Sequence, residues 1–176
     1  LIRYNKALQH RNALLKADDG KTDDTLFELW ENELVKEGTL IYEKRKAFIN
    51  EFIPTFQQFY DLISLSHEKV SLRYESPLDD ADFRKLLIQK RQKDKVLGYT
   101  SAGIHKDDLE MQIDGYPVKR TGSQGQNKTF VVALKFAQFD FLQQVGHTSP
   151  ILLLGDIFDN LDSSRVEQIV KLVFGE

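Results

Sequence analysis

Apolar side chains recur every three or four positions along the first third of the chain, which is the period of an amphipathic helix. This spacing predicts a helix over residues 3–16, a second around residues 26–35 and a third over residues 41–63. The first two are separated by the polar turn Asp18-Asp19-Gly20-Lys21 and form a predicted helical hairpin. Residues 1–66 are therefore predicted to form a helical arm.

Two residues inside this arm disfavour one continuous helix. Gly38 interrupts the pattern weakly because glycine lowers helix stability, and Pro54 fits only at a kink or in the first turn of a new helix. The third helix also has an aromatic stripe, which is more typical of core packing than of stacking on nucleic-acid bases. Its members are Phe48, Phe52, Phe56 and Phe59.

After the arm the apolar period changes from helical to two, which is typical of a half-buried strand. Alternation over residues 70–74 predicts such a strand, closed by Ser76-Pro77. A helix that carries Phe83, Leu86 and Leu87 and ends near Val96-Leu97-Gly98 follows, with Asp79 or Asp80 as its predicted N-cap. The fold class is therefore α/β, mixed with α+β character, and residues 67–176 form its body.

A polar loop and a predicted hairpin come next. Leu109, Met111 and Ile113 alternate with polar residues before an Asp114-Gly115 turn, which is a hairpin signature. His105, Asp107 and Asp108 in the preceding loop have no partner at a metal-ligand spacing, so no metal is assigned to them.

The densest positive cluster lies in the predicted helix that ends near Val96-Leu97-Gly98. Such a run is typical of a solvated helix face, and it is also a candidate contact for a phosphate backbone. Its members are Lys90, Arg91, Lys93 and Lys95.

A glycine-bearing polar turn, Gly122-Ser123-Gln124-Gly125-Gln126, precedes a long segment with an apolar stripe that ends near Leu142. The first N–H groups of a helix have no partners within it, so they and the positive end of the helix dipole can bind an anion. An ordinary helix start capped by serine is the alternative. The turn is a candidate phosphate site.

Four consecutive apolar residues, Ile151 to Leu154, predict a parallel strand that is buried on both faces. Gly155 and Asp156 follow it directly. Carboxylates at the carboxyl edge of such a strand lie where α/β folds bind ligands. Ser163 or Ser164 is predicted to cap a final helix.

Composition narrows the class of protein. The 176 residues have a formal net charge of −3 and 41% hydrophobic content, and no apolar run is long enough to span a membrane. The chain has no cysteine, which excludes disulfides and fits the cytoplasm. It begins without Met and stops after a helical pattern, so we expect a piece of a longer protein.

Taken together, these motifs resemble the RecF family of DNA repair proteins, whose nucleotide-binding head is of the ABC, SMC and Rad50 kind. The resemblance covers nearly the whole chain and begins with Tyr4-Asn5-Lys6-Ala7-Leu8 and residues 11–16. It continues with Gly103-Ile104-His105-Lys106-Asp107-Asp108-Leu109, where Ile104 and Lys106 depart from the family loop, and with Ser123-Gln124-Gly125-Gln126, which is similar to the ABC signature. Ile151-Leu152-Leu153-Leu154-Gly155-Asp156 resembles the Walker B segment, and Asp159-Asn160-Leu161-Asp162 resembles the D-loop.

The resemblance implies a composite ATP site, in which two heads form an ATP-dependent homodimer and each gives its signature motif to the nucleotide of its partner. Ser123 and the backbone at Gly125 would contact the γ-phosphate, supported by Gln126 and Lys128. Asp156 would be the catalytic acid that orients water and a possible ligand for Mg²⁺, and Asp162 would link the two sites. Positioning and charge stabilisation are what phosphoryl transfer requires.

Two departures from the family pattern affect this expectation. No Gly-x-x-x-x-Gly-Lys-Ser/Thr motif occurs, so the P-loop is expected upstream of Leu1, and the chain alone is expected to be inactive as an ATPase. Gly155 stands where the family has the first of two consecutive acids, so the hold on Mg²⁺ is expected to be weaker.

The family further implies DNA, at junctions of single and double strands, and recombination mediator proteins as partners, with no membrane. Two alternatives remain open. One is another SMC-like or Rad50-like head, such as an overcoming-lysogenization-type nuclease ATPase. The other is a non-catalytic module that binds protein or DNA through the arm and the basic helix.

Overall fold

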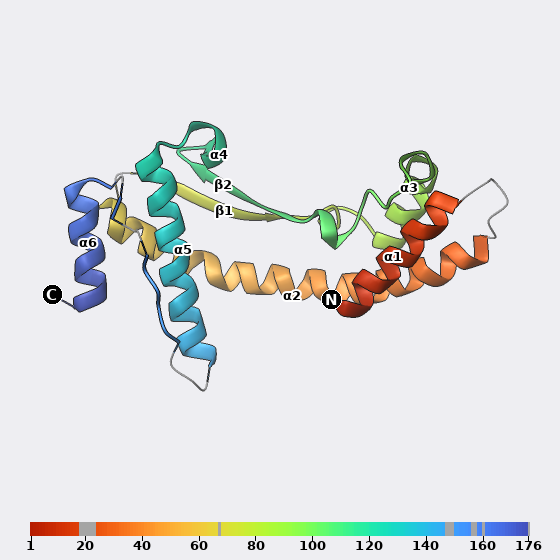
Figure 1. The fold of residues 1–176 in the computed structure, drawn as a ribbon, viewed down its shortest axis with the longest axis horizontal. Coiled ribbons are helices and arrows are strands. Elements are labelled where there is room, and N and C mark those ends of the chain that lie inside the picture. Colours follow the sequence, from red (N-terminus) through yellow and green to blue (C-terminus); the bar gives the residue numbers. More distant parts are fainter. Residues whose placement is uncertain (18–23, 67, 147–149, 156–157, 160, 176) are drawn as a thin grey trace. The chain divides into compact units, whose positions relative to one another are not determined.

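The computed structural model describes residues 1–17, 24–66, 68–146, 150–155, 158–159 and 161–175 (Figure 1). The chain divides into two compact units. Unit 1 comprises Leu1–Ala47 and Tyr74–Asp108, and unit 2 comprises Phe48–Arg73 and Leu109–Glu176. The sequence predicts a different division, with an arm over residues 1–66 and a body over residues 67–176. That domain boundary stays a prediction. In the part of the chain that is described, no helix is both long and apolar enough to cross a bilayer.

The predicted arm consists of two helices, α1 (Ile2–Ala17) and α2 (Asp24–Ser64). The interruption that we expect at Gly38 is absent, since α2 runs through it. A Cβ atom on residue 38 would lie 2.6 Å from Cε1 of Phe83. Glycine at this position therefore makes room for an aromatic ring of α3 (Phe83–Leu97) and does not end the helix.

Pro54 also lies inside α2. A proline removes one helical hydrogen bond and disfavours a helix interior. Its neighbours Phe52 and Phe56 are buried in the core of unit 2. We infer that burial of these rings holds the helix together across Pro54. The assignment to core packing is confirmed for Phe52, Phe56 and Phe59, whereas Phe48 is 40% exposed.

Unit 1 packs α1, the first part of α2, and α3 around a small apolar core. Asp82 caps α3, and its side chain accepts a hydrogen bond from the backbone N–H of Lys85. The prediction of Asp79 or Asp80 as the cap is wrong, because Asp79 instead contacts Tyr42 and Lys46. The buried core residues are Tyr4, Ala7, Leu34, Leu78, Phe83, Leu87 and Ile104.

A three-stranded sheet follows the order β1 (Val70–Glu75), β2 (Asp108–Ile113) and β3 (Tyr116–Pro117). Strands β2 and β3 are antiparallel and pair Ile113 with Tyr116, so the predicted hairpin is confirmed. Its two turn residues, Asp114 and Gly115, have φ values of 51° and 81°. Positive φ at both positions is typical of the turn that matches the strand twist.

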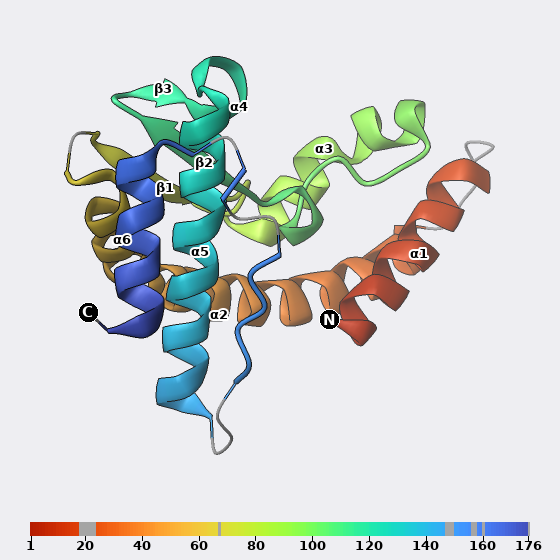
Figure 2. The ribbon, with the colours of Figure 1, turned by 60° about the vertical axis from the view of Figure 1, so that its left-hand side comes forward.

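Unit 2 contains the short helix α4 (Val118–Thr121), the long helix α5 (Gln124–Val145) and the last helix α6 (Ser163–Phe174). Figures 1 and 2 show α5 and α6 side by side, and Phe130, Ala133 and Ile169 share one buried cluster. Asp162 caps α6, so the prediction of Ser163 or Ser164 as the cap is wrong. The shared core brings the starts of both helices into the same unit.

The segment from Ile151 to Leu154 is not a strand in the structure. Ile151 and Leu153 are 87% and 78% exposed, whereas Leu152 and Leu154 pack against the core of unit 2. The alternation shows an extended segment with one apolar face on the core, and within the described ranges no strand pairs with it. The prediction of a strand buried on both faces is therefore wrong for this structure, because the core covers only one face of the segment.

Candidate functional site

The start of α5 has the geometry of a capping box. The Ser123 hydroxyl oxygen accepts a hydrogen bond from the backbone N–H of Gln126 at 3.1 Å. In return, the Gln126 side-chain oxygen accepts one from the backbone N–H of Ser123 at 2.8 Å. This reciprocal pair satisfies two of the N–H groups that a helix start leaves without partners. The predicted helix start at the glycines is confirmed.

The capping box leaves hydrogen-bond donors for a ligand. The N–H groups of Gln124 and Gly125 belong to the first turn, where no helical carbonyl can accept from them. The Ser123 oxygen acts as an acceptor in the box, so its hydrogen remains to donate. Ser123 and Gln124 are exposed. Together with the positive end of a 22-residue helix, these groups can hold a phosphate.

Gln126 joins the helix start to the interior of unit 2. Its side-chain nitrogen donates to Oε1 of Glu68 at 2.9 Å, while its oxygen serves the capping box. The hydroxyl of Tyr60 donates to the other Glu68 oxygen at 2.5 Å. Both ends of the Gln126 amide are thus used inside the protein. In this structure Gln126 supports the helix start, and its part in ATP binding stays a prediction.

Glu68 is held as a carboxylate by its partners. Burial raises the pKa of Glu68, but the hydrogen bonds from Tyr60 and Gln126, together with the Arg165 guanidinium, outweigh burial and leave this pKa below its ordinary value. Burial and the Glu68 carboxylate in turn raise the pKa of Tyr60. The carboxylate therefore stays charged around neutral pH and keeps its partners in place.

Arg165, in the first turn of α6, contacts three parts of this site. Its Nη2 lies 2.9 Å from Oε1 of Glu68, and its Nη1 donates to the Thr129 hydroxyl at 3.0 Å. Its Nε lies 3.3 Å from Oδ2 of Asp162. Glu68, Thr129 and Arg165 are not among the site residues predicted from the sequence. The spacing of three from Asp162 to Arg165 was the one local signal, since the other partners are distant in sequence.

The remaining predicted residues of the ATP site have different placements. Asp156 and Asn160 lie outside the described residues. Asp159 is exposed, Leu161 packs against the core of unit 2, and Asp162 caps α6. Burial is intermediate for Lys128. The structure thus brings the start of the signature segment and the end of the D-loop segment into one hydrogen-bonded network.

The local structure does not require glycine at position 155. Its φ lies outside the left-handed range, and a Cβ atom built on it would meet nothing within 4 Å. An aspartate at this position would therefore need no rearrangement of the backbone. The glycine removes a carboxylate without offering the packing or turn geometry that usually explains a glycine.

The family loop belongs to unit 1, where its residues make internal contacts. The side-chain oxygens of Asp107 accept hydrogen bonds from Arg45 at 2.7 Å, from Ser76 at 2.6 Å, and from Tyr74. Gly103 has a φ of 134°, and a Cβ atom there would lie 2.5 Å from the Tyr4 hydroxyl. Lys106 is exposed, and its ammonium lies 5.3 Å from the centre of the Tyr99 ring. In this structure Gly103 and Asp107 hold the loop against its own unit.

His105 makes one hydrogen bond through each of its two ring nitrogens. Its Nδ1 lies 2.9 Å from the Tyr4 hydroxyl, and its Nε2 lies 3.0 Å from the Thr100 carbonyl oxygen. Because that carbonyl only accepts, Nε2 carries the hydrogen and Nδ1 accepts from Tyr4. Burial lowers the pKa of His105 and Lys106 lowers it further, against the opposing effects of Thr100, Asp107 and Asp94.

This lowered pKa predicts a loss of stability in acid. Between the pKa of unfolded histidine, about 6.5, and the lower folded pKa, the unfolded chain binds more protons, so stability falls as the pH falls through that window. The urea midpoint of unit 1, followed by fluorescence of the single tryptophan, Trp30, should drop between pH 7.5 and 5.5. His105→Gln, which keeps a donor and an acceptor, should show a shallower drop. Equal drops in both proteins would contradict the role of His105.

The basic run on α3 is partly used within unit 1. Arg91 pairs with Glu31 at 2.6 Å and with Asp24 at 3.2 Å. The Lys95 ammonium lies 5.3 Å from the centre of the Phe27 ring. Lys93 is exposed and burial of Lys90 is intermediate. Of the four predicted phosphate contacts, Arg91 therefore has a clear structural role, and contact with DNA stays a prediction.

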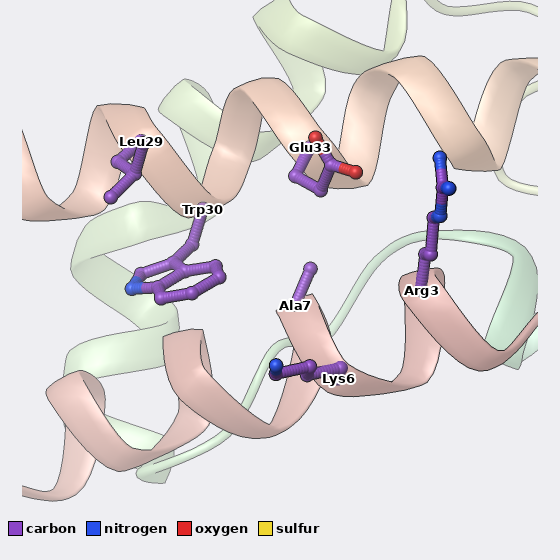
Figure 3. A pocket seen from close by; sticks show the side chains of 6 residues that line it. All are labelled: Arg3, Lys6, Ala7, Leu29, Trp30 and Glu33. Carbon is purple, nitrogen blue, oxygen red and sulfur yellow. The ribbon is translucent and has the colours of Figure 1, made fainter.

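Unit 1 also has a shallow pocket of about 290 Å³ between α1 and α2 (Figure 3). The Trp30 ring lies along it and stacks on His10 with a centroid distance of 4.1 Å. No predicted site residue lines this pocket, so it adds nothing to the candidate site in unit 2. Its lining residues are Arg3, Lys6, Ala7, Leu29, Trp30 and Glu33.

Comparison with solved structures defines the class of protein. The chain matches two structures of the recombination mediator protein RecF in the RecFOR pathway, one designated RecF-ATP and the other RecF-ATPrS. Both have a TM-score of 0.82, cover 99% of this chain and 49% of theirs, and are 28% and 26% identical to it, respectively. The helix-rich mixed fold with a small sheet is thus that of a member of the ABC ATPase family.

Comparison with known sequences defines the family more closely. The chain is 54% identical over all its 176 residues to the DNA replication and repair protein RecF of Bacteroides thetaiotaomicron, and covers 47% of that protein. It is 48% identical to RecF of Flavobacterium johnsoniae and covers 50% of it. The resemblance to RecF is confirmed along the whole chain, which spans about half the length of these relatives. No protein-family model matches it.

Proposed function

We propose that this chain acts in a RecF-like, ATP-dependent DNA-binding protein of recombinational repair and replication. Within that protein, the start of α5 contacts the γ-phosphate of an ATP molecule held by a partner subunit, so that ATP joins two heads. The partners are DNA and recombination mediator proteins. The relatives named RecF and the RecF-ATP structure support this proposal.

The observation that supports it best is the capping box at the start of α5. Ser123 and Gln126 satisfy each other, which fixes the helix start before any ligand binds. The N–H groups of Gln124 and Gly125 and the Ser123 hydroxyl then form a preorganised set of donors. Such donors stabilise the negative charge of a phosphate at no reorganisation cost when it arrives.

The described residues fit a phosphate at the start of α5, but they do not fit a Mg²⁺ ion. Within the described ranges, no group of three or more His, Cys, Asp or Glu side chains is placed to hold a metal ion. Residue 155 has no side chain to offer, and Asp156 lies outside those ranges. Asp156 remains the proposed residue for orienting water.

The proposal predicts that Ser123→Arg abolishes ATP-driven dimerisation of the full-length protein. The arginine removes the capping hydroxyl and places a bulky side chain where the phosphate would bind, so a loss of at least about tenfold in dimer affinity is expected. Dimerisation is measured by size-exclusion chromatography with light scattering, with and without ATP.

Gln138→Arg is the matched control, because Gln138 is exposed on the same helix about four turns away. This control should dimerise like the unmodified protein. ATP-driven dimerisation that persists unchanged in Ser123→Arg would overturn the assignment of α5 as the phosphate-facing helix.

A further inference from the structure

Arg165 is placed to join three segments of unit 2 that are far apart in sequence. Its side chain is only 14% exposed and contacts Glu68 ahead of β1, Thr129 in α5, and Asp162 at the cap of α6. The three contacts use three different nitrogen atoms of the guanidinium. The planar fork of arginine presents its donors in fixed directions, unlike the flexible ammonium of lysine.

Two routes of hydrogen bonds connect Arg165 with the start of α5. On the first, Glu68 accepts from Arg165 and from Gln126, whose oxygen holds the backbone of Ser123. On the second, the Thr129 hydroxyl accepts from Arg165 and donates to the Gly125 carbonyl at 2.9 Å. Any shift of the first turn of α5 therefore disturbs contacts of Arg165.

The same arginine also holds the cap of α6. The Asp162 carboxylate accepts from the backbone N–H of Arg165 at 3.0 Å and pairs with the Arg165 side chain at 3.3 Å. The hydrogen bond from Ser164, followed by that backbone bond, lowers the pKa of Asp162. Asp162 is therefore charged at neutral pH and stays paired with Arg165.

We propose that Arg165 is a positioning residue that couples the phosphate-facing start of α5 to Asp162 at the N-cap of α6. A ligand that orders Ser123 and Gly125 also orders Gln126 and Thr129, and through Arg165 it orders the cap of α6. Conversely, loss of Arg165 leaves the donors of α5 present but less well ordered. This inference rests on the proposed function for its ligand, although the contacts that it invokes are independent of any ligand.

The first test measures order at the start of α5 in the full-length protein without nucleotide. Arg165→Met should accelerate hydrogen exchange of the Gln126 and Asn127 amides, which bond within the capping turn, by about tenfold. Ile169→Val is the control, because Ile169 is buried in the same helix, makes no polar contact and loses one methyl group. Unchanged exchange in Arg165→Met, or an equal acceleration in the control, would overturn the proposal.

The second test separates positioning from a general loss of stability. ATP-driven dimerisation is compared in Ser123→Ala, Arg165→Met and the double variant. If the two residues are coupled, the fold-loss of dimer affinity in the double variant should be at least about threefold smaller than the product of the two single fold-losses. Ile169→Val combined with Ser123→Ala should instead give that product. If Arg165→Met does not fold, Arg165→Lys keeps the charge but not the fork and replaces it.

The outcomes distinguish this inference from the proposed function. No loss of dimerisation in Ser123→Ala or in Ser123→Arg would count against the phosphate site, and the exchange experiment would still decide the coupling. A loss in Ser123→Ala that multiplies simply with the loss in Arg165→Met would leave the phosphate site standing and refute the coupling.

Discussion

Replacing Arg11 with methionine is expected to destabilise unit 1 by about 3–5 kcal/mol, because it leaves a buried charge without its partner. The Arg11 side chain is fully buried and bonds Glu31 of α2, Asp94 of α3 and the Thr100 hydroxyl, the last two at 2.8 Å. One guanidinium thus joins α1, α2 and α3. A loss of this size is a large part of the stability of an ordinary domain.

The contacts predict which of the two carboxylates, Glu31 or Asp94, loses more of its stabilising contacts when Arg11 is removed. Glu31 keeps a second ion pair with Arg91 at 2.6 Å, whereas Asp94 would retain the Ser101 backbone N–H as its side-chain hydrogen bond. Adding Asp94→Asn to Arg11→Met should therefore recover stability, and adding Glu31→Gln should recover less. The urea midpoint followed by Trp30 fluorescence measures both, since Trp30 lies in unit 1.

Arg3→Met is the control for this experiment. The Arg3 side chain is 75% exposed and lies 3.8 Å from Glu37, so its removal should change stability by less than about 0.5 kcal/mol. If Arg11→Met unfolded at the same urea concentration as Arg3→Met, the buried network would contribute nothing to unit 1.

Introducing aspartate at position 155 of the full-length protein is expected to raise Mg²⁺-dependent ATP hydrolysis by about tenfold or more. This expectation rests on the proposed function, with Gly155 at the place of the first Walker B acid. The space around Gly155 is open and its φ is ordinary, so the new carboxylate costs no strain. Loss of a carboxylate that supports a bound metal typically changes activity by about 10–100-fold.

Gly155→Asn is the matched control, because it has the same shape without the charge. Hydrolysis is measured over a Mg²⁺ titration in all three proteins, and only the aspartate variant should reach its maximal rate at lower Mg²⁺. If the aspartate and asparagine variants gave the same rate as the unmodified protein, the glycine would not be the cause of weak metal binding.

Local patterns along the sequence determined most of the secondary structure. The helical period predicted α1 and α5, the alternation predicted β1 and the β2–β3 hairpin, and Ser123 predicted the start of α5. These features depend on neighbouring residues in the chain, such as a capping side chain three positions from its N–H partner, so the sequence can specify them by itself. The motifs also sufficed to predict the resemblance to RecF.

Tertiary structure decided what depends on partners distant in sequence. Gly38 looked like a helix break, but it makes room for Phe83, and α2 continues. The apolar run after Pro150 looked like a strand, but the described fold covers only one of its faces. Arg11 and Arg165 bind acids 83 and 97 residues away, respectively. Periodicity reports on the neighbours of a residue along one element, whereas burial and ion pairing depend on which elements meet in space.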